Sequence, residues 1–214
     1  MKFAICSLSD RESLRSLSWP LIDFYCKRRG WDFITKTEPY VTDRHPSWSK
    51  LLLLKELLPL YDVVIWVDDD IVFTQPTVKF EDLIRPFLDS DKPLAVSENN
   101  STPFNFGLIV VKNTAGEIID QIWNNIDEET RFGLFWEESA AERLYKTDET
   151  FRNKIYIVPP AIIQGFHPAN CNVKYKWYYK TFALHVSGFK DIQYRIKLMK
   201  QAIDELRLES RHLV

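Results

Sequence analysis

The sequence predicts an α/β fold in which a central, mostly parallel sheet is flanked by helices. Segments rich in β-branched and aromatic residues alternate with amphipathic segments along the first half of the chain, the order that builds a parallel sheet. The run Val63–Val67 is β-branched or aromatic throughout, which is typical of a strand buried on both faces. Three aspartates follow it directly, where open α/β sheets bind their ligands. The sequence therefore predicts an enzyme with a site at this edge.

The first half is regular enough to place each element in order. Ser9 and Glu12 have the spacing of a capping box, which predicts that a helix opens there. Gly30 marks its end, and Pro20 inside it is expected to kink or split it. In chain order, the predicted strands are 3–6, 32–37 and 63–67, and the predicted helices are 9–30 and 47–60.

The second half is less regular. It predicts strands at 94–96, 106–111 and 155–158 and helices at 114–126 and 137–145. A terminal amphipathic helix is indicated by apolar residues spaced four, three, four and three apart, namely Ile192, Ile196, Met199, Ile203 and Leu206. We expect one domain over 1–214, with a nucleotide- and metal-binding half (1–100), a sugar and acceptor half (101–190) and a C-terminal helix (191–214).

Composition narrows the class of partner. The net charge of −2 gives no general attraction to nucleic acid, and weak contact of the terminal helix with a membrane surface is a secondary expectation. The three cysteines are widely spaced and odd in number, which does not indicate a disulfide framework. The first residues are too few for a signal sequence and no stretch approaches the roughly 20 apolar residues of a membrane span. We therefore expect a cytoplasmic protein.

The three aspartates predict a cation site. In an extended backbone, residues two apart point the same way, so Asp68 and Asp70 can converge on one cation while Asp69 faces elsewhere. His185, on a predicted short strand before a glycine-containing turn, is the candidate third ligand. An oxygen, oxygen, nitrogen set suits Mn²⁺ and is tolerated by Mg²⁺.

Four motifs together resemble the GT-A-fold, DxD-motif glycosyltransferases that use nucleotide sugars. Within that group the chain is most similar to galactosyl-, xylosyl- and mannosyltransferase-like enzymes, in the order and the spacing of the motifs. The motifs are Trp48-Ser49-Lys50 before a leucine-rich helix, Asp68-Asp69-Asp70, Asn105-Phe106-Gly107, and His185-Val186-Ser187-Gly188.

The resemblance implies a role for each matching residue. Asp70 and His185 would bind the metal, and Asp68 the metal or the ribose of a UDP-sugar donor. Lys190 would neutralise the diphosphate, and the hexose would pass to a glycan or other hydroxyl acceptor. The remaining donor-site residues are Ser7 and Ser9 for base and ribose, Asn105 and Gly107 for the sugar or acceptor, and Lys50 and Gly188 within their motifs.

A catalytic base is the least defined part of this expectation. An inverting transferase needs a carboxylate near the anomeric carbon, and Glu137 or Glu138 at a predicted helix start is the candidate. The resembling enzymes often carry Asp-Gln there, so this departure leaves the choice of residue and the stereochemistry open. Asp69 is a further catalytic candidate.

Two other functions remain open from the sequence. Asp68 and Asp70 also fit the haloacid-dehalogenase-type phosphatase pattern, as nucleophile and acid/base, although no downstream aspartate motif completes that magnesium site. A non-catalytic module that only binds a nucleotide sugar or cation is the other alternative. Absence of turnover would favour the binding module.

A bacterial cytosol, or host cytoplasm for a protein encoded by a large DNA virus, is the expected location.

Overall fold

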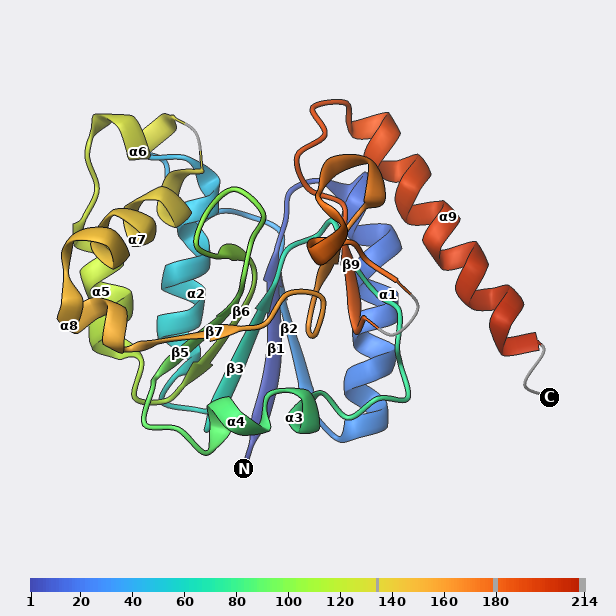
Figure 1. The fold of residues 1–214 in the computed structure, drawn as a ribbon, viewed down its shortest axis with the longest axis horizontal. Helices are drawn as coiled ribbons and strands as arrows, with labels where there is room; N and C mark the ends of the chain where they lie inside the picture. Colours follow the sequence, from blue (N-terminus) through green and yellow to red (C-terminus); the bar gives the residue numbers. More distant parts are fainter. Residues whose placement is uncertain (134, 179–180, 212–214) are drawn as a thin grey trace.

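The computed structural model describes residues 1–133, 135–178 and 181–211, with side chains up to Leu206. A central six-stranded sheet has helices on both faces (Figure 1). Its strands are β1 (Phe3–Leu8), β2 (Asp32–Lys36), β3 (Val63–Val67), β5 (Leu94–Ser97), β6 (Asn105–Lys112) and β7 (Ile155–Val158). The longer helices are α1 (Glu12–Arg29), α2 (Ser49–Leu57), α5 (Gly116–Asn124), α7 (Trp136–Thr147) and α9 (Ile192–Arg211). The short ones are α3 (Phe80–Leu83), α4 (Arg85–Leu88), α6 (Glu128–Phe132) and α8 (Glu149–Asn153).

The sheet is mostly parallel, as the sequence predicts. The strand order is β2-β1-β3-β6-β5-β7. Pairs β1–β2, β1–β3 and β5–β7 are parallel, while β6 runs antiparallel to β3 and β5. The carboxyl ends of β1 and β3 therefore lie at the same edge as the amino end of β6, so that residues from three distant parts of the chain meet there.

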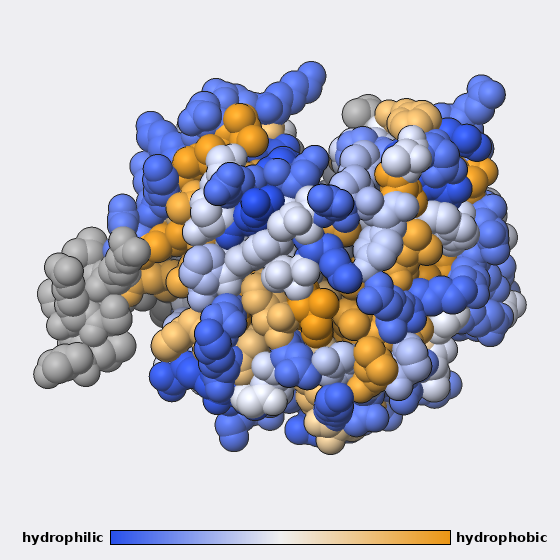
Figure 2. Space-filling model, turned by 180° about the vertical axis from the view of Figure 1, so that it is seen from behind, coloured by the Kyte–Doolittle hydropathy of each residue, from blue (hydrophilic) through white to orange (hydrophobic). Residues whose placement is uncertain are grey.

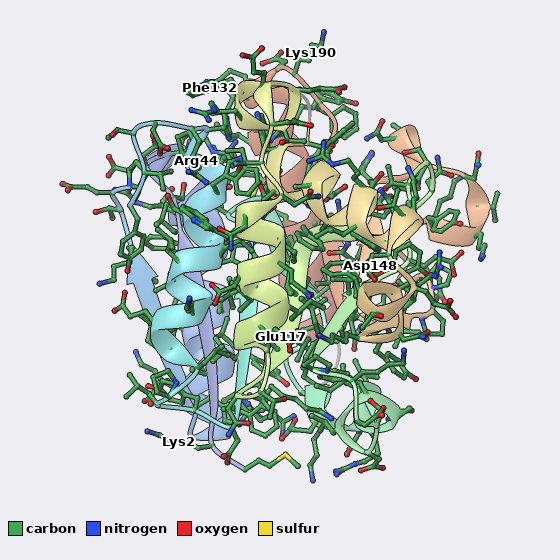
Figure 3. All side chains as sticks on the ribbon, turned by 90° about the vertical axis from the view of Figure 1, so that its left-hand side faces the viewer. Lys2, Arg44, Glu117, Phe132, Asp148 and Lys190 are labelled. Carbon is green, nitrogen blue, oxygen red and sulfur yellow. The ribbon has the colours of Figure 1, made fainter. Side chains whose placement is uncertain are left out.

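Alternate side chains of the strands pack on opposite faces. On one face, α2, α5 and α7 cover side chains such as Val64 and Ile109, and Figure 3 shows α2 and α5 lying in front of the sheet. On the other face, α1 and the α3–α4 segment cover residues such as Ile65 and Val110. Burial of both faces explains why the strands are nearly continuous in apolar residues.

A second, three-stranded sheet positions the far end of the chain. It consists of β4 (Ile71–Phe73), β9 (Ala183–His185) and β8 (Gly165–Phe166), in the order β4-β9-β8. β4 follows the three aspartates directly and pairs antiparallel with β9, with Ile71 opposite His185. The histidine is thereby fixed beside residues more than 100 positions earlier in the chain.

Helix α9 is held on this small sheet by its apolar stripe. Met199 is fully buried, and it belongs to one core cluster with Leu14 of α1, Val72 of β4 and Leu184 of β9. The predicted terminal helix is therefore confirmed from Ile192 onward, and its first turn lies near the edge that carries the aspartates. Residues 212–214 of the predicted C-terminal segment lie outside the described residues.

Several local predictions were wrong. The capping box does not form: Arg11 is the N-cap of α1 and makes no side-chain cap bond. The Ser9 hydroxyl instead accepts from the Arg11 backbone N–H at 3.0 Å and donates to Asp69. Pro20 does not split α1, which runs unbroken to the left-handed Gly30. The predicted helix 47–60 is a 3-10 turn (Pro46–Trp48) followed by the shorter α2, and 114–126 shrinks to Gly116–Asn124.

Over the residues that the structure describes, no helix is both long and apolar enough to cross a bilayer.

Docking of α9 is testable through its buried methionine. Met199→Ala leaves a cavity between α9, α1 and the small sheet, and we expect it to lower the free energy of unfolding by about 2–5 kcal/mol. Urea denaturation measures this change. The exposed Lys197 on the same helix provides a control, because Lys197→Ala should stay within about 0.5 kcal/mol of the unmodified protein. Equal effects of the two substitutions would contradict the packing described here.

Candidate active site

A cavity of about 760 Å³ lies where the carboxyl ends of β1 and β3 meet the small sheet and the start of α7. From behind, the upper edge of the molecule is hollowed between the side that carries α9 and the side that carries α6 and α7 (Figure 2). The volume is in the range of small-molecule and cofactor sites. Its wall includes Ser9, Lys50, the three aspartates, Asn105, Glu137, Glu138, His185, Gly188 and Arg195.

Asp68, Asp70 and His185 form one cluster on this wall. Each offers a ligand atom, and the three atoms all lie within 4.8 Å of one another. The His185 Nε2 is 3.2 Å from the Asp70 Oδ1, close to the separation of two neighbouring ligands on an ion that each binds at about 2.1 Å. The structure thus brings together the three residues that the sequence predicts as metal ligands.

The donor set fits a divalent ion of the Mn²⁺ or Mg²⁺ type. Two carboxylates and one imidazole supply hard oxygen and borderline nitrogen ligands. Asp70 and His185 are almost completely buried, whereas Asp68 is partly open to the cavity. The group could therefore hold a cation with one side open to the cavity, as an ion that also binds a ligand requires.

The Asp70 carboxylate is fixed from two sides. Oδ1 faces His185, and Oδ2 accepts a hydrogen bond of 3.0 Å from the Arg195 Nη1. Burial by itself would raise the pKa of Asp70, but the charges of His185, Arg195 and Arg11 lower it well below the usual range. Asp70 is therefore an anion at neutral pH.

Lys50 anchors Asp68. Its buried ammonium lies 3.3 Å from the Asp68 Oδ1 and 2.8 Å from the Glu137 Oε1, and it donates to the Phe106 carbonyl at 3.1 Å. The Trp66 indole donates to the same Asp68 oxygen at 2.6 Å. Burial alone would lower the pKa of Lys50, but Asp68 and Glu137 raise it above its ordinary value. Lys50 is thus a permanent charge that positions both acids.

Asp69 points away from the cation cluster, as the alternation of side chains predicts. It accepts hydrogen bonds from Ser9 and, through both carboxylate oxygens, from the Arg11 guanidinium. Burial and the charge of Asp70 raise the pKa of Asp69 to about 6, although Arg11 and Ser9 lower it. These bonds tie the loop after β1 to the end of β3. A catalytic role for Asp69 stays a prediction.

The two glutamates at the start of α7 have different surroundings. Glu137 pairs with Lys50 through one oxygen, and its buried Oε2 has no hydrogen-bond partner among the described residues. The Glu138 Oε2 accepts from the Phe106 backbone N–H at 2.7 Å and from Asn105 at 3.2 Å. Burial, with the charge of Glu137, raises the pKa of Glu138 to about 8. Glu138 is therefore mainly protonated at neutral pH, while Glu137 is paired with a cation.

Gly107 is required by the position of the histidine ring. A Cβ at this position would lie 2.2 Å from the His185 Cε1 and 2.7 Å from its Nδ1. The Asn105 side chain accepts from the Gly107 N–H at 2.9 Å and from Gln164 at 2.9 Å. Gly107 therefore acts on the site by leaving room for the His185 ring, whereas Asn105 itself lines the cavity.

Some predicted residues do not reach the cavity wall. Ser7 is fully buried and accepts a hydrogen bond from the Trp19 indole at 3.0 Å. Lys190 is exposed and lies at the outer end of the molecule (Figure 3), and neither it, Ser7 nor Gly107 belongs to the cavity lining. Gly188 does line the cavity, in the left-handed conformation at φ 81°, and a Cβ there would meet the Asn170 side chain.

Other residues of the wall were not predicted from the sequence. Arg11 and Arg195 line the cavity and contact the aspartates. His45 stacks on Trp136 with ring centroids 3.5 Å apart, and both residues line the cavity. The loop position of Arg11, immediately after the first strand, was a usable signal. Nothing in the sequence separates Arg195 from the other basic residues of the terminal helix.

Comparison with known proteins supports the fold. No family model matches the chain, and no curated protein matches it in sequence. Solved structures do match. A glycosyltransferase involved in the glycosylation of the major capsid of PBCV-1 superposes with a TM-score of 0.74 at 17% identity, covering 94% of this chain and 100% of that chain.

Two further glycosyltransferase structures superpose less closely. The galactosyltransferase LgtC, in complex with donor and acceptor sugar analogues, gives a TM-score of 0.55 at 8% identity over 96% of each chain. The catalytic domain of Drosophila β1,4-galactosyltransferase 7, in complex with xylobiose, gives 0.51 at 13% identity over 93% of this chain and 79% of that chain. The predicted fold is thus confirmed: the chain has the fold of the GT-A-type glycosyltransferases, with an Asp-Asp-His cluster on its cavity wall.

Proposed function

We propose that this protein is a metal-dependent glycosyltransferase that moves a hexose from a UDP-sugar to a hydroxyl acceptor such as a glycan. The observation that carries the proposal is the Asp68, Asp70 and His185 cluster on the wall of the large cavity. That cluster lies on a fold shared with glycosyltransferases, one of which was solved with donor and acceptor sugar analogues. Fold alone does not define the reaction, so the proposal depends on the site.

The ligand residues suit Mn²⁺, with Mg²⁺ as an alternative. When bound, such an ion supplies a Lewis acid that stabilises the charge on a departing diphosphate. Asp70 and His185, both buried, define the ion's position, while Asp68 can reach the ion or the ribose from the open side of the cluster. Lys50 and Trp66 hold the Asp68 carboxylate in that orientation.

The surroundings of the two glutamates divide their roles. Glu137 is paired with the Lys50 ammonium, and its buried Oε2 has no partner among the described residues. It is therefore the better candidate for accepting the proton of an acceptor hydroxyl or for bonding a sugar hydroxyl. Glu138 holds a proton at neutral pH and orients Asn105 and the Phe106 amide. It is therefore a positioning residue and cannot act as a base in that state.

Ser9 and Arg11 shape the part of the cavity after β1, where the base and ribose are expected. Both are bonded to Asp69, so this aspartate fixes the loop without pointing at the cation cluster. The cavity continues to Asn105 and Gly188, the other motif residues on the wall. A nucleotide sugar can thus contact all the motif segments in one site.

The proposed reaction predicts metal-dependent release of UDP. With Mn²⁺ and a panel of nucleotide sugars, the protein should release UDP from at least one UDP-hexose, and EDTA should abolish the release. Asp70→Asn and His185→Ala each remove a ligand and should lower the rate by at least about 100-fold. The control is Asp120→Ala, an aspartate on α5 outside the cavity lining, which should leave the rate unchanged.

The same assays distinguish the other two functions. Cleavage of p-nitrophenyl phosphate with Mg²⁺, without release of UDP, would instead indicate the phosphatase. Binding of UDP-sugars with Mn²⁺ in the absence of any turnover would indicate the non-catalytic binding module.

Gly107→Ala tests the metal site without removing a ligand. The added methyl group would overlap the His185 ring and force it to move, so we expect the affinity for Mn²⁺ to fall by about tenfold or more. Isothermal titration calorimetry with Mn²⁺ measures the effect. Gly116→Ala is the matched control, because a Cβ there has ordinary contacts only. Unchanged Mn²⁺ affinity in the Gly107 variant would contradict ligation by His185 in the orientation described.

Glu138 predicts a specific pH dependence of stability. The folded protein keeps the Glu138 proton up to about pH 8, whereas an unfolded chain releases it near about pH 4.3. The folded state therefore binds the extra proton in between, and the contribution to stability is complete below about pH 4.3 and is lost as the pH rises toward 8.

Glu138→Gln should remove this contribution. Between pH 4.5 and 8.5 the free energy of unfolding of the variant should rise relative to the unmodified protein by a few kcal/mol, on the order expected from about 1.4 kcal/mol per pKa unit. Urea denaturation at several pH values measures the difference. Glu117→Gln, at an exposed side chain, should give a profile parallel to the unmodified protein. A parallel profile for Glu138→Gln would show that Glu138 is ionised in the folded state.

A further inference from the structure

Arg195 is a cation in direct contact with a predicted metal ligand. It lies in the first turn of α9, and its Nη1 donates to the Asp70 Oδ2 at 3.0 Å. The Nε donates to the Phe189 carbonyl at 2.6 Å, which fixes the plane of the guanidinium. Arg195 is about one-fifth exposed and lines the cavity, so its remaining N–H groups can face a bound molecule.

The cations around the cavity are not equally free to bind phosphate. Lys50 has three N–H donors, and its ammonium already has three acceptors, in Asp68, Glu137 and the Phe106 carbonyl. The Arg11 fork is bidentate on Asp69. Arg195 uses one N–H on the backbone and one on Asp70, out of five. Arg11 and Arg195 thus each use two of their five N–H groups. Of the two, Arg195 is the one that bonds a predicted metal ligand, because Arg11 bonds Asp69.

We propose that Arg195 binds the diphosphate of the donor while it holds the Asp70 carboxylate through Oδ2. The inference rests on the proposed function and assigns to Arg195 the role that the sequence alone suggested for Lys190. Lys190 is exposed and does not line the cavity. Arginine presents a planar set of donors that matches phosphate oxygens, which a lysine ammonium does not.

Because Arg195 contacts Asp70, it is expected to affect the binding of the metal ion and the binding of the diphosphate in opposite directions. Arg195 bonds the Asp70 Oδ2, while Oδ1 faces His185. A metal ion at the cluster would therefore lie close to the positive charge of Arg195 and be repelled by it when no nucleotide is present. A diphosphate on the ion gives Arg195 a second anionic partner, so that Arg195 then favours the complex. A residue with only a structural role would affect both binding events in the same direction.

Substitution of Arg195 should therefore change the two affinities in opposite directions. In Arg195→Met, the dissociation constant for UDP at saturating Mn²⁺ should rise by about tenfold or more, the loss expected for a charge-assisted hydrogen bond. The dissociation constant for Mn²⁺ alone should fall, because a positive charge next to Asp70 has been removed. Isothermal titration calorimetry measures both constants, and the melting temperature verifies that the variant is folded.

Three further variants sharpen the result. Arg195→Lys keeps the charge but loses the planar donors, so its UDP affinity should lie between those of the unmodified protein and Arg195→Met; it also serves if the methionine variant does not fold. Lys197→Met, at an exposed lysine of the same helix, should leave both constants unchanged. Lys190→Met tests Lys190, the residue that the sequence suggested for binding the diphosphate.

Each negative outcome has a distinct meaning. If the unmodified protein does not bind UDP with Mn²⁺, the proposed function fails and this inference fails with it. If it binds UDP but Arg195→Met binds UDP equally well, or if Lys190→Met alone weakens binding, only the assignment of Arg195 is overturned. Weaker binding of both Mn²⁺ and UDP by Arg195→Met would show that Arg195 merely supports the structure.

Discussion

The structure depends on how three consecutive carboxylates are neutralised at one buried edge of the sheet. Asp69 and Asp70 are only 2% and 3% exposed, and burying such charges is unfavourable unless each has a partner. The partners come from separate parts of the chain: Lys50 of α2 for Asp68, Arg11 before α1 for Asp69, and His185 with Arg195 for Asp70. The residues that neutralise the three aspartates therefore also line the cavity.

This pairing also determines which groups remain available for chemistry. Lys50 is shared between Asp68 and Glu137, so the loop after β3 and the start of α7 are held to one ammonium. Glu138, next to a carboxylate and away from a direct cation partner among the described residues, retains its proton near neutral pH. Two neighbouring acids of the same type therefore have different surroundings, one beside the Lys50 ammonium and one bonded to a backbone N–H and an amide, a pattern that often separates roles within an active site.

The fold class and the Asp-Asp-His cluster could be predicted because each leaves a local signal. The strand β3 is marked by its β-branched and aromatic run, and the side-chain alternation after it separates Asp69 from Asp68 and Asp70. Shorter elements leave too little signal: β4 and β8 have three and two residues and were not predicted. The Ser9 capping box failed because the helix begins only at Glu12, with Arg11 as its N-cap. The Ser9 oxygen accepts from the Arg11 N–H before the helix, and its hydroxyl donates to Asp69.

The sequence by itself determined the mostly parallel α/β sheet, the acidic strand end and the histidine that completes the cluster, because hydrophobic periodicity and residue chemistry are local properties. Only the tertiary structure decided which cations meet these acids and which predicted residues reach the cavity. Ser7 and Lys190 carry suitable groups but point elsewhere, whereas Arg195 reaches Asp70 because α9 packs across β4 and α1. Contacts between residues 125 positions apart depend on that packing, which no local pattern specifies.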